Sequence, residues 1–146
     1  MIKVVPDSSV IVKWVNQDNE LNLERADKLL DDVRAGKVEL IAPELAKYEV
    51  GNALTKKGVS DLQAFQSLGT VYSLPIRFMS ETETLADETY QMANGVRATE
   101  NPPKFTYYDA SFIAMAKQER AVLVTANPQH QIKIAGVKVV PLGDYK

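Results

Sequence analysis

The chain has 146 residues and a formal net charge of −2, and 45% of its residues are hydrophobic, which fits one globular domain, 1–146, with a core. It has no cysteine, which excludes disulfides and thiolate metal sites, and no apolar run of about 18 residues, which argues against a transmembrane helix. The N-terminus lacks a signal-peptide pattern, and these absences together favour a cytoplasmic protein. The charge lacks the basic excess of proteins that grip a long duplex.

The first half of the chain predicts two strands, each followed by helices. Residues 2–6 are apolar and β-branched, which predicts a buried strand, and a short helix follows over 7–15. Apolar residues recur at helical spacing over 21–34, which predicts a second helix. A short strand over 39–42 then leads into a helix over Pro43–Lys57, with the proline in its first turn.

The second half continues the alternation of helices and strands. In chain order we expect a helix over 60–72, a strand over 74–79, an amphipathic helix over 82–96, a loop over 98–106, a helix over 107–119, and strands over 121–125 and 137–140. Strands separated by helices predict an α/β fold with a mostly parallel sheet. Sites in such sheets lie beyond the carboxyl ends of strands, where Asp7 and residues 125–127 are expected.

Three carboxylates stand in apolar surroundings. Asp7 ends the apolar run of the first predicted strand. Glu49 interrupts the apolar face of the third predicted helix, and Asp109 shares the inward side of the sixth. Because an isolated buried carboxylate is costly, such acids are usually paired with a cation. Oxygen-only ligands favour a hard ion, so the three acids predict a Mg²⁺ or Mn²⁺ site.

Each acid also has an ordinary structural explanation. Asp7 directly precedes a helix and could be its N-cap. Glu49 could lie at the margin of the apolar face and reach water. Asp109 could form a capping box with Thr106, in which its carboxylate reaches back to the Thr106 N–H. Glu44, in the first turn of its helix, is the main rival to Glu49 as a ligand.

Four motifs in order carry a resemblance to a known family. They are Asp7-Ser8-Ser9-Val10, Ala42-Pro43-Glu44-Leu45 leading to Tyr48-Glu49-Val50, Tyr108-Asp109-Ala110, and Leu123-Val124-Thr125-Ala126-Asn127. In this order, over about residues 2–142, the chain resembles the PIN-domain family, and most of all the toxin ribonucleases of VapBC toxin–antitoxin pairs. The resemblance implies a three-layer α/β/α fold around a mostly parallel sheet.

The resemblance also implies a metal-dependent endoribonuclease that cuts single-stranded or looped RNA. Asp7, Glu49 and Asp109 match the first three acids of the family and would bind Mg²⁺ or Mn²⁺. The fourth position, normally Asp, is Asn127 here, which can offer a carbonyl oxygen but no charge. This departure keeps open a PIN-like scaffold of weakened activity that acts as an RNA- or protein-binding module.

Other side chains would support the acids or contact RNA. Ser9 and Thr125 could orient carboxylates or waters by hydrogen bonds, unless they only cap local structure. The only histidine, His130, is expected on an exposed turn and is not needed for the chemistry. Candidate RNA contacts are Lys13, Arg97, Lys104 and Lys117, with Tyr107 or Tyr108 to stack a base, although such residues are more often ordinary surface and core.

Partners and rival functions follow from the same residues. The resemblance implies a homodimer that a small antitoxin protein holds inactive, with no membrane role; the helices over 21–34 and 60–72 could form such contacts. A phospho-acceptor signalling domain would pair adjacent acids after the first strand, whereas Asp7 is followed by Ser8. A plain interaction module, whose acids only cap helices, would bind no Mn²⁺.

Overall fold

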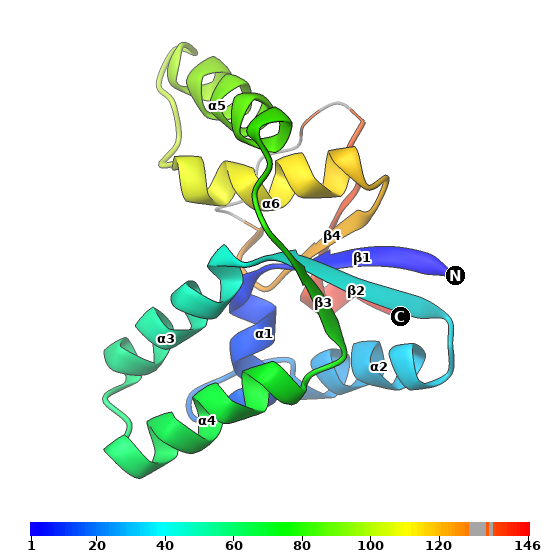
Figure 1. Ribbon diagram of the computed structural model, residues 1–146, viewed down its shortest axis with the longest axis vertical. Helices are drawn as coiled ribbons and strands as arrows, with labels where there is room; N and C mark the ends of the chain where they lie inside the picture. Colours follow the sequence, from blue (N-terminus) through cyan, green and yellow to red (C-terminus); the bar gives the residue numbers. More distant parts are fainter. Residues whose placement is uncertain (129–133, 135) are drawn as a thin grey trace.

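A parallel β-sheet lies at the centre of the structure, with helices on both of its faces (Figure 1). The computed structural model describes residues 1–128, 134 and 136–146. The strands are β1 (Ile2–Pro6), β2 (Val38–Pro43), β3 (Ile76–Met79), β4 (Val122–Thr125) and β5 (Val139–Pro141). The helices are α1 (Ser8–Val15), α2 (Leu23–Arg34), α3 (Leu45–Lys57), α4 (Asp61–Ser73), α5 (Glu83–Arg97) and α6 (Tyr107–Gln118), with a 3₁₀ turn η2 (Leu142–Asp144). Among the described helices, none has the length and apolar character needed to cross a membrane.

The order of the strands defines where a site can form. Within the described residues the order is β3-β2-β1-β4-β5, and every pairing is parallel. The chain runs outward from β1 to β3 and then returns to the other side of β1 to form β4. The order therefore reverses between β1 and β4, which is where open α/β sheets bind their ligands. Asp7 follows β1 and Ala126 follows β4, so both lie at this point.

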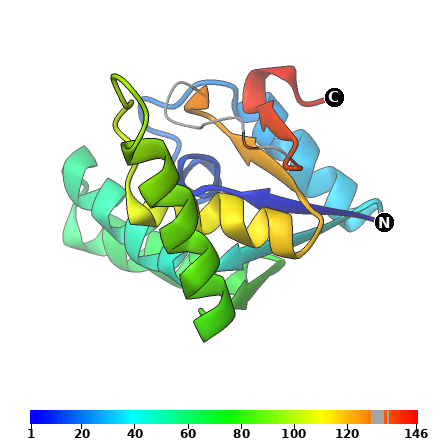
Figure 2. The same cartoon turned by 90° about the horizontal axis from the view of Figure 1, so that it is seen from above.

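Two layers of helices enclose the sheet. Helices α5 and α6 lie on one side, and α1, α2 and the α3–α4 pair lie on the other (Figure 1). Helix α6 packs on β1, β2 and β4, and α5 crosses its outer side (Figure 2). The core joins all three layers, and its fully buried side chains include Val5, Ile11, Leu29, Ile41, Ile113 and Leu123. The predicted three-layer α/β/α fold with a parallel sheet is confirmed.

Local sequence explains where the helices begin and end. Ser60 and Thr106 each open a helix with a capping box, which Gln63 and Asp109 complete. Gly58 follows α3 with a φ of +66°, a left-handed conformation that glycine adopts without strain and that ends the helix. The predicted helices and strands are found, with their ends displaced by one or two residues.

The predicted position of Pro43 is wrong. We expected it in the first turn of α3, but it is the last residue of β2 and pairs with Met79 of β3. The N–H of Glu44, one residue later, donates to the Met79 carbonyl at 3.0 Å. Because Glu44 makes this hydrogen bond to β3, the strand can end in Pro43, which has no N–H to donate. The proline also favours extended backbone at Ala42, which continues the strand.

Candidate active site

Asp7 lies where the carboxyl edge of the sheet meets the start of α1. Its backbone N–H donates to the Val124 carbonyl of β4 at 3.1 Å. Its side chain accepts hydrogen bonds from the N–H of Ser9, at 3.1 Å, and from the Ser9 hydroxyl. The N-cap interpretation of Asp7 is thus confirmed, and the residue is only 5% exposed. Capping fixes the carboxylate at the point where the strand order reverses.

Two hydroxyl groups connect Asp7 to the segment after β4. The Ser9 hydroxyl donates to Asp7 Oδ1 and accepts the N–H of Ala126 at 3.0 Å. The Thr125 hydroxyl, which is fully buried, accepts the N–H of Asn127 at 3.0 Å. Ser9 therefore orients a carboxylate, and Thr125 shapes the backbone that carries Asn127.

The other two predicted acids come from helices on opposite sides of the sheet. Glu49 lies on α3 and is partly buried. Asp109 lies in the first turn of α6, where its N–H donates to the Thr106 hydroxyl at 3.1 Å. Asp109 Oδ2 in turn accepts the N–H of Thr106 at 3.0 Å, so the capping box is confirmed. This bond uses one carboxylate oxygen, and the same side chain also lines a pocket with Asp7 and Glu49.

The structure brings the three acids and Asn127 to one pocket of about 130 Å³, which we call the acid pocket. Its lining residues are Asp7, Ser8, Ser9, Glu49, Asp109, Phe112 and Asn127. Within the described residues, no three acidic, histidine or cysteine side chains are close enough to form a ready metal site. The acids therefore surround a space rather than form a closed shell of ligands.

The electrostatics of the acid pocket favour a bound cation. Burial and the negative charge of Asp109 raise the pKa of Glu49 to about 7, and the charge of Asp7 adds a smaller effect. The Ser8 hydroxyl, which donates to Glu49 Oε1 at 3.4 Å, and the charge of Lys56 act in the opposite direction. A cation near these carboxylates would stabilise the ionised form of Glu49. Carboxylate and amide oxygens are ligands that Mg²⁺ and Mn²⁺ accept, so the residues fit such an ion.

Some of the predicted RNA contacts lie next to the acids. Lys104 and Tyr108 line a pocket of about 310 Å³ whose wall also includes Asp109. Arg97 and Tyr107 instead line a pocket of about 290 Å³ between α5 and the segment before α6. Lys104 and Tyr108 therefore lie beside the acid pocket.

Two other predicted contacts are engaged in ion pairs. Lys13 is 6% exposed, and its ammonium group lies 2.9 Å from the Glu20 carboxylate. Lys117, toward the end of α6, pairs with Glu88 of α5 at 2.8 Å and does not line the acid pocket. The structure thus separates Lys117 from the acid pocket, although Asp109 lies on the same helix. The expectation for His130 lies outside the described residues.

The sequence analysis missed two side chains that affect Glu49. Ser8 donates a hydrogen bond to it, and Lys56 lowers its pKa by its charge. Helical spacing could have identified Lys56, which lies two turns after Glu49 on the same face of α3. Glu44, the predicted rival ligand, pairs with Lys47 at 3.0 Å and does not line the acid pocket.

Comparison with known proteins identifies the fold and the family. Residues 4–137 match the model of the PIN domain. No curated protein matches the sequence. The solved VapBC2 of Rickettsia felis, bound to a DNA fragment from its promoter, has a TM-score of 0.72 and 12% identity, covering 96% of this chain and 98% of that chain.

Two further structures share the fold. The DNA-bound VapBC of Salmonella typhimurium has a TM-score of 0.69 and 15% identity over 97% of this chain and 99% of that chain. VapC20 of Mycobacterium tuberculosis, a sarcin–ricin loop cleaving toxin, has a TM-score of 0.62 and 14% identity over 84% and 87%. The family model spans nearly the whole chain, and the parallel sheet with helices on both faces agrees with it. This chain therefore belongs to the PIN domain family.

Proposed function

We propose that this protein is a metal-dependent endoribonuclease that cuts single-stranded or looped RNA and uses Mg²⁺ or Mn²⁺. The observation that carries the proposal is the convergence of Asp7, Glu49 and Asp109 on the acid pocket, with the raised pKa of Glu49. Membership of the PIN domain family supports a nuclease. VapC20, which shares the fold, is a toxin that cleaves the sarcin–ricin loop.

Each residue of the acid pocket would have a distinct task. Asp7, Glu49 and Asp109 would hold the ion by carboxylate oxygens, and Asn127 would add an amide oxygen. Glu49 would give up its proton as the ion binds, because the positive charge of the ion opposes the burial and the negative charge of Asp109 that raise its pKa. Ser9 would keep the Asp7 carboxylate in one orientation. When bound, the ion would supply a water of lowered pKa and polarise the phosphoryl oxygen.

The RNA would approach on the side of Lys104. This exposed lysine and Tyr108 line the pocket next to Glu49 and Asp109. A cation can contact a phosphate, and an exposed tyrosine ring can stack on an unpaired base. Short single strands and loops, which expose their bases, suit such a site better than a long duplex. The net charge of −2 agrees with this limited contact.

A second candidate function is a PIN-like scaffold of weakened activity that binds RNA or protein. Asn127 favours it, because a neutral amide stands where proteins of the family normally have a fourth carboxylate. The metal would then be held by fewer charges and would bind more weakly. Cleavage that needs metal and disappears with Asp7→Asn would exclude this function.

We also propose that the protein is the toxin of a toxin–antitoxin pair, acting in the cytoplasm as a single domain. The VapBC structures that share its fold support a small antitoxin as its partner. A homodimer is proposed as well. Helix α4 carries a row of exposed apolar side chains, formed by Leu62, Phe65, Leu68 and Tyr72, with Tyr48 of α3 also exposed. Such a surface fits a protein contact better than water.

One cleavage assay tests the enzymatic proposal. A labelled single-stranded RNA is incubated with the protein and Mn²⁺, with Mn²⁺ and excess chelator, and with the Glu49→Gln variant. Cleavage should occur only in the first condition. Glu44→Gln is the matched control, since Glu44 has the same side chain on the same segment but pairs with Lys47 outside the acid pocket. If Glu44→Gln also abolishes cleavage, the assignment of Glu49 is wrong.

A further inference from the structure

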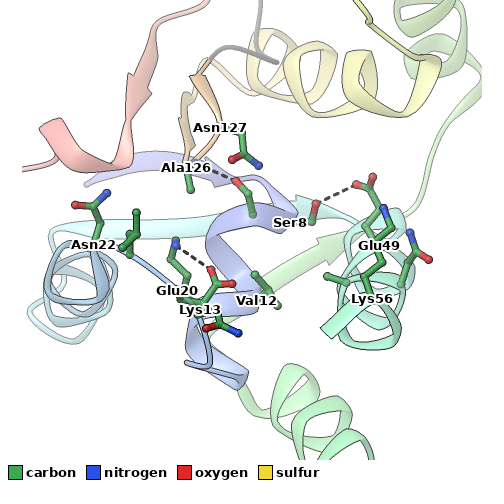
Figure 3. Close-up of a pocket in the computed structure, with 14 residues that line it drawn as sticks. Ser8, Val12, Lys13, Glu20, Asn22, Glu49, Lys56, Ala126 and Asn127 are labelled. Carbon is green, nitrogen blue, oxygen red and sulfur yellow. Dashed lines mark hydrogen bonds and ion pairs between the residues drawn. The ribbon is translucent and has the colours of Figure 1, made fainter. Parts of the chain in front are cut away.

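A larger cavity of about 510 Å³ opens beside the acid pocket, and we call it the side cleft. Its walls come from α1, α3, the segment between α1 and α2, and the end of β4 (Figure 3). The two cavities share four lining residues, which are Ser8, Ser9, Glu49 and Asn127. A polymer with one phosphate at the acids would therefore place its next unit in the side cleft.

The lining of the side cleft has the chemistry of a nucleobase site. Val12 and Ala53 form apolar parts of its wall, against which the face of a base could lie. Asn22 and Asn52 also line it, and their amide groups can donate and accept hydrogen bonds as base edges do. In the part of the chain that the structure describes, neither amide side chain is used in a hydrogen bond to protein. Both are thus available to a ligand.

The charge around the side cleft suits a phosphate. The Glu20 carboxylate is shared between Lys13, at 2.9 Å, and Lys57, at 2.7 Å, so this group of three carries one positive charge in excess. Lys56 is exposed on the wall of the cleft, next to Glu49 (Figure 3). The cleft lining itself holds two lysines, Lys13 and Lys56, and two glutamates, Glu20 and Glu49, so its positive charge is local to Lys56 and to the two lysines around Glu20.

We propose that the side cleft binds the nucleotide adjacent to the scissile phosphate and sets the sequence preference of cleavage. The base lies against Val12 and Ala53, its edge meets Asn52, and Lys56 contacts its phosphate. This inference rests on the proposed ribonuclease function. Polar amides, a free lysine and continuity with the acids favour a nucleotide over a segment of a partner protein, which would call for a more apolar groove.

The test uses short single-stranded RNAs that differ in the nucleotides on either side of one cleavage site, cut in the presence of Mn²⁺. Asn52→Ala and Lys56→Gln should each raise KM about fivefold, the size of one lost polar contact, and the cavity-filling Ala53→Leu should raise KM as well. Asn52→Ala and Ala53→Leu should leave kcat unchanged. Asn52→Ala and Ala53→Leu should also weaken the preference at one flanking position. Thermal melting shows whether each variant is folded.

Matched controls lie outside the cleft. Gln66→Ala removes an exposed amide from α4, and Lys37→Gln removes an exposed positive charge from the turn before β2. Neither should change KM or the preference. If all three cleft variants cut like the wild type, the side cleft is not a nucleotide site, while the ribonuclease function stands. If they cut normally but lose a partner protein, the cleft is a docking site and the proposal is equally wrong.

A binding measurement separates the two proposals if the wild type cuts no RNA. The four nucleoside 5′-monophosphates are added, with chelator present, to protein labelled with ¹⁵N. The side-chain amide signals of Asn22 and Asn52 should shift, and Asn52→Ala should weaken binding of the monophosphate that shifts them most. Unchanged signals would overturn the nucleotide site independently of cleavage.

Discussion

Asp109 on α6 and Glu49 on α3 line the same pocket, and burial together with the charge of Asp109 raises the pKa of Glu49 to about 7. The two residues are 60 positions apart in the chain and reach the pocket from opposite sides of the sheet. Their repulsion has a cost for the folded protein whenever both carboxylates are ionised without a cation. This cost can be measured without any assumption about the substrate.

Replacing Glu49 by Gln should stabilise the metal-free protein at pH 8. The ordinary pKa of a glutamate, 4.5, is raised to about 7 by folding, so the folded state holds a proton that the unfolded chain has lost. Stability therefore falls as pH rises from 4.5 to about 7, and the loss is complete above that range. Because the side chain is partly solvated, we expect a gain of about 1 kcal/mol, or about 2–4 °C in Tm.

The pH dependence provides the control for this variant. At pH 4 the protonated Glu49 of the folded wild type and the glutamine of the variant are both uncharged. Glu49→Gln and the wild type should therefore melt at nearly the same temperature in chelator. Glu44→Gln should give no gain at pH 8, because that carboxylate pairs with Lys47. A destabilised Glu49→Gln at pH 8 would show that the carboxylate is not repelled in the folded protein.

Ser9→Ala should weaken both the fold and the proposed activity. The Ser9 hydroxyl bonds to Asp7 and to the N–H of Ala126, so its loss releases the carboxylate and leaves a backbone donor without its partner. We expect a loss of roughly 1–3 kcal/mol in the free energy of unfolding, measured in urea, and a lower kcat. Ser8→Ala is the matched control, since its hydroxyl makes only a 3.4 Å contact with Glu49. Equal losses in the two variants would contradict the role of Ser9.

The acids could be predicted because their local patterns are specific. Asp7 ends a β-branched strand directly before a helix, and this pattern alone indicates an N-cap at the carboxyl edge of a sheet. Asp109 stands three residues after Thr106, which is the spacing of a capping box. Both caps depend on neighbours within three residues. Their convergence with Glu49 depends on the order of the strands, and it was predicted from the family resemblance rather than from the local pattern.

Features that depend on distant partners could not be predicted. Pro43 belongs to β2 because it pairs with Met79 of β3, where the N–H of Glu44 donates to the Met79 carbonyl. The local sequence does not reveal this pairing, because a proline at the start of a helix has the same neighbours. Lys13 can be buried because its ammonium group pairs with the Glu20 carboxylate, which also pairs with Lys57, and nothing near Lys13 in the sequence indicates this pairing. Ion pairs and strand register are set by the tertiary fold.

Asn127→Asp should lower the Mn²⁺ concentration needed for half-maximal cleavage. Asn127 lines the acid pocket, so a carboxylate there adds a negative charge next to Asp7, Glu49 and Asp109. A cation should then bind several-fold more tightly, as expected from an added charged oxygen ligand. The measurement is a Mn²⁺ titration of the cleavage rate. Asn94→Asp on α5, outside the acid pocket, is the control for net charge, and an equal response in the two variants would count against Asn127 as a ligand.

Phe65→Glu on α4 should convert the proposed homodimer into a monomer. Phe65 is 78% exposed in one chain, so a charge there costs the isolated fold little, but it would be buried in a contact that covers the exposed apolar row of α4. The mass should halve in sedimentation analysis while Tm in dilute solution stays within a few degrees. Tyr90→Glu places the same charge on an exposed aromatic position of α5 and should leave the mass unchanged. If Phe65→Glu keeps the mass of the wild-type dimer, the contact lies elsewhere on the surface. If the wild type is itself a monomer, the row on α4 is free to bind the antitoxin, and Phe65→Glu should then weaken that complex instead.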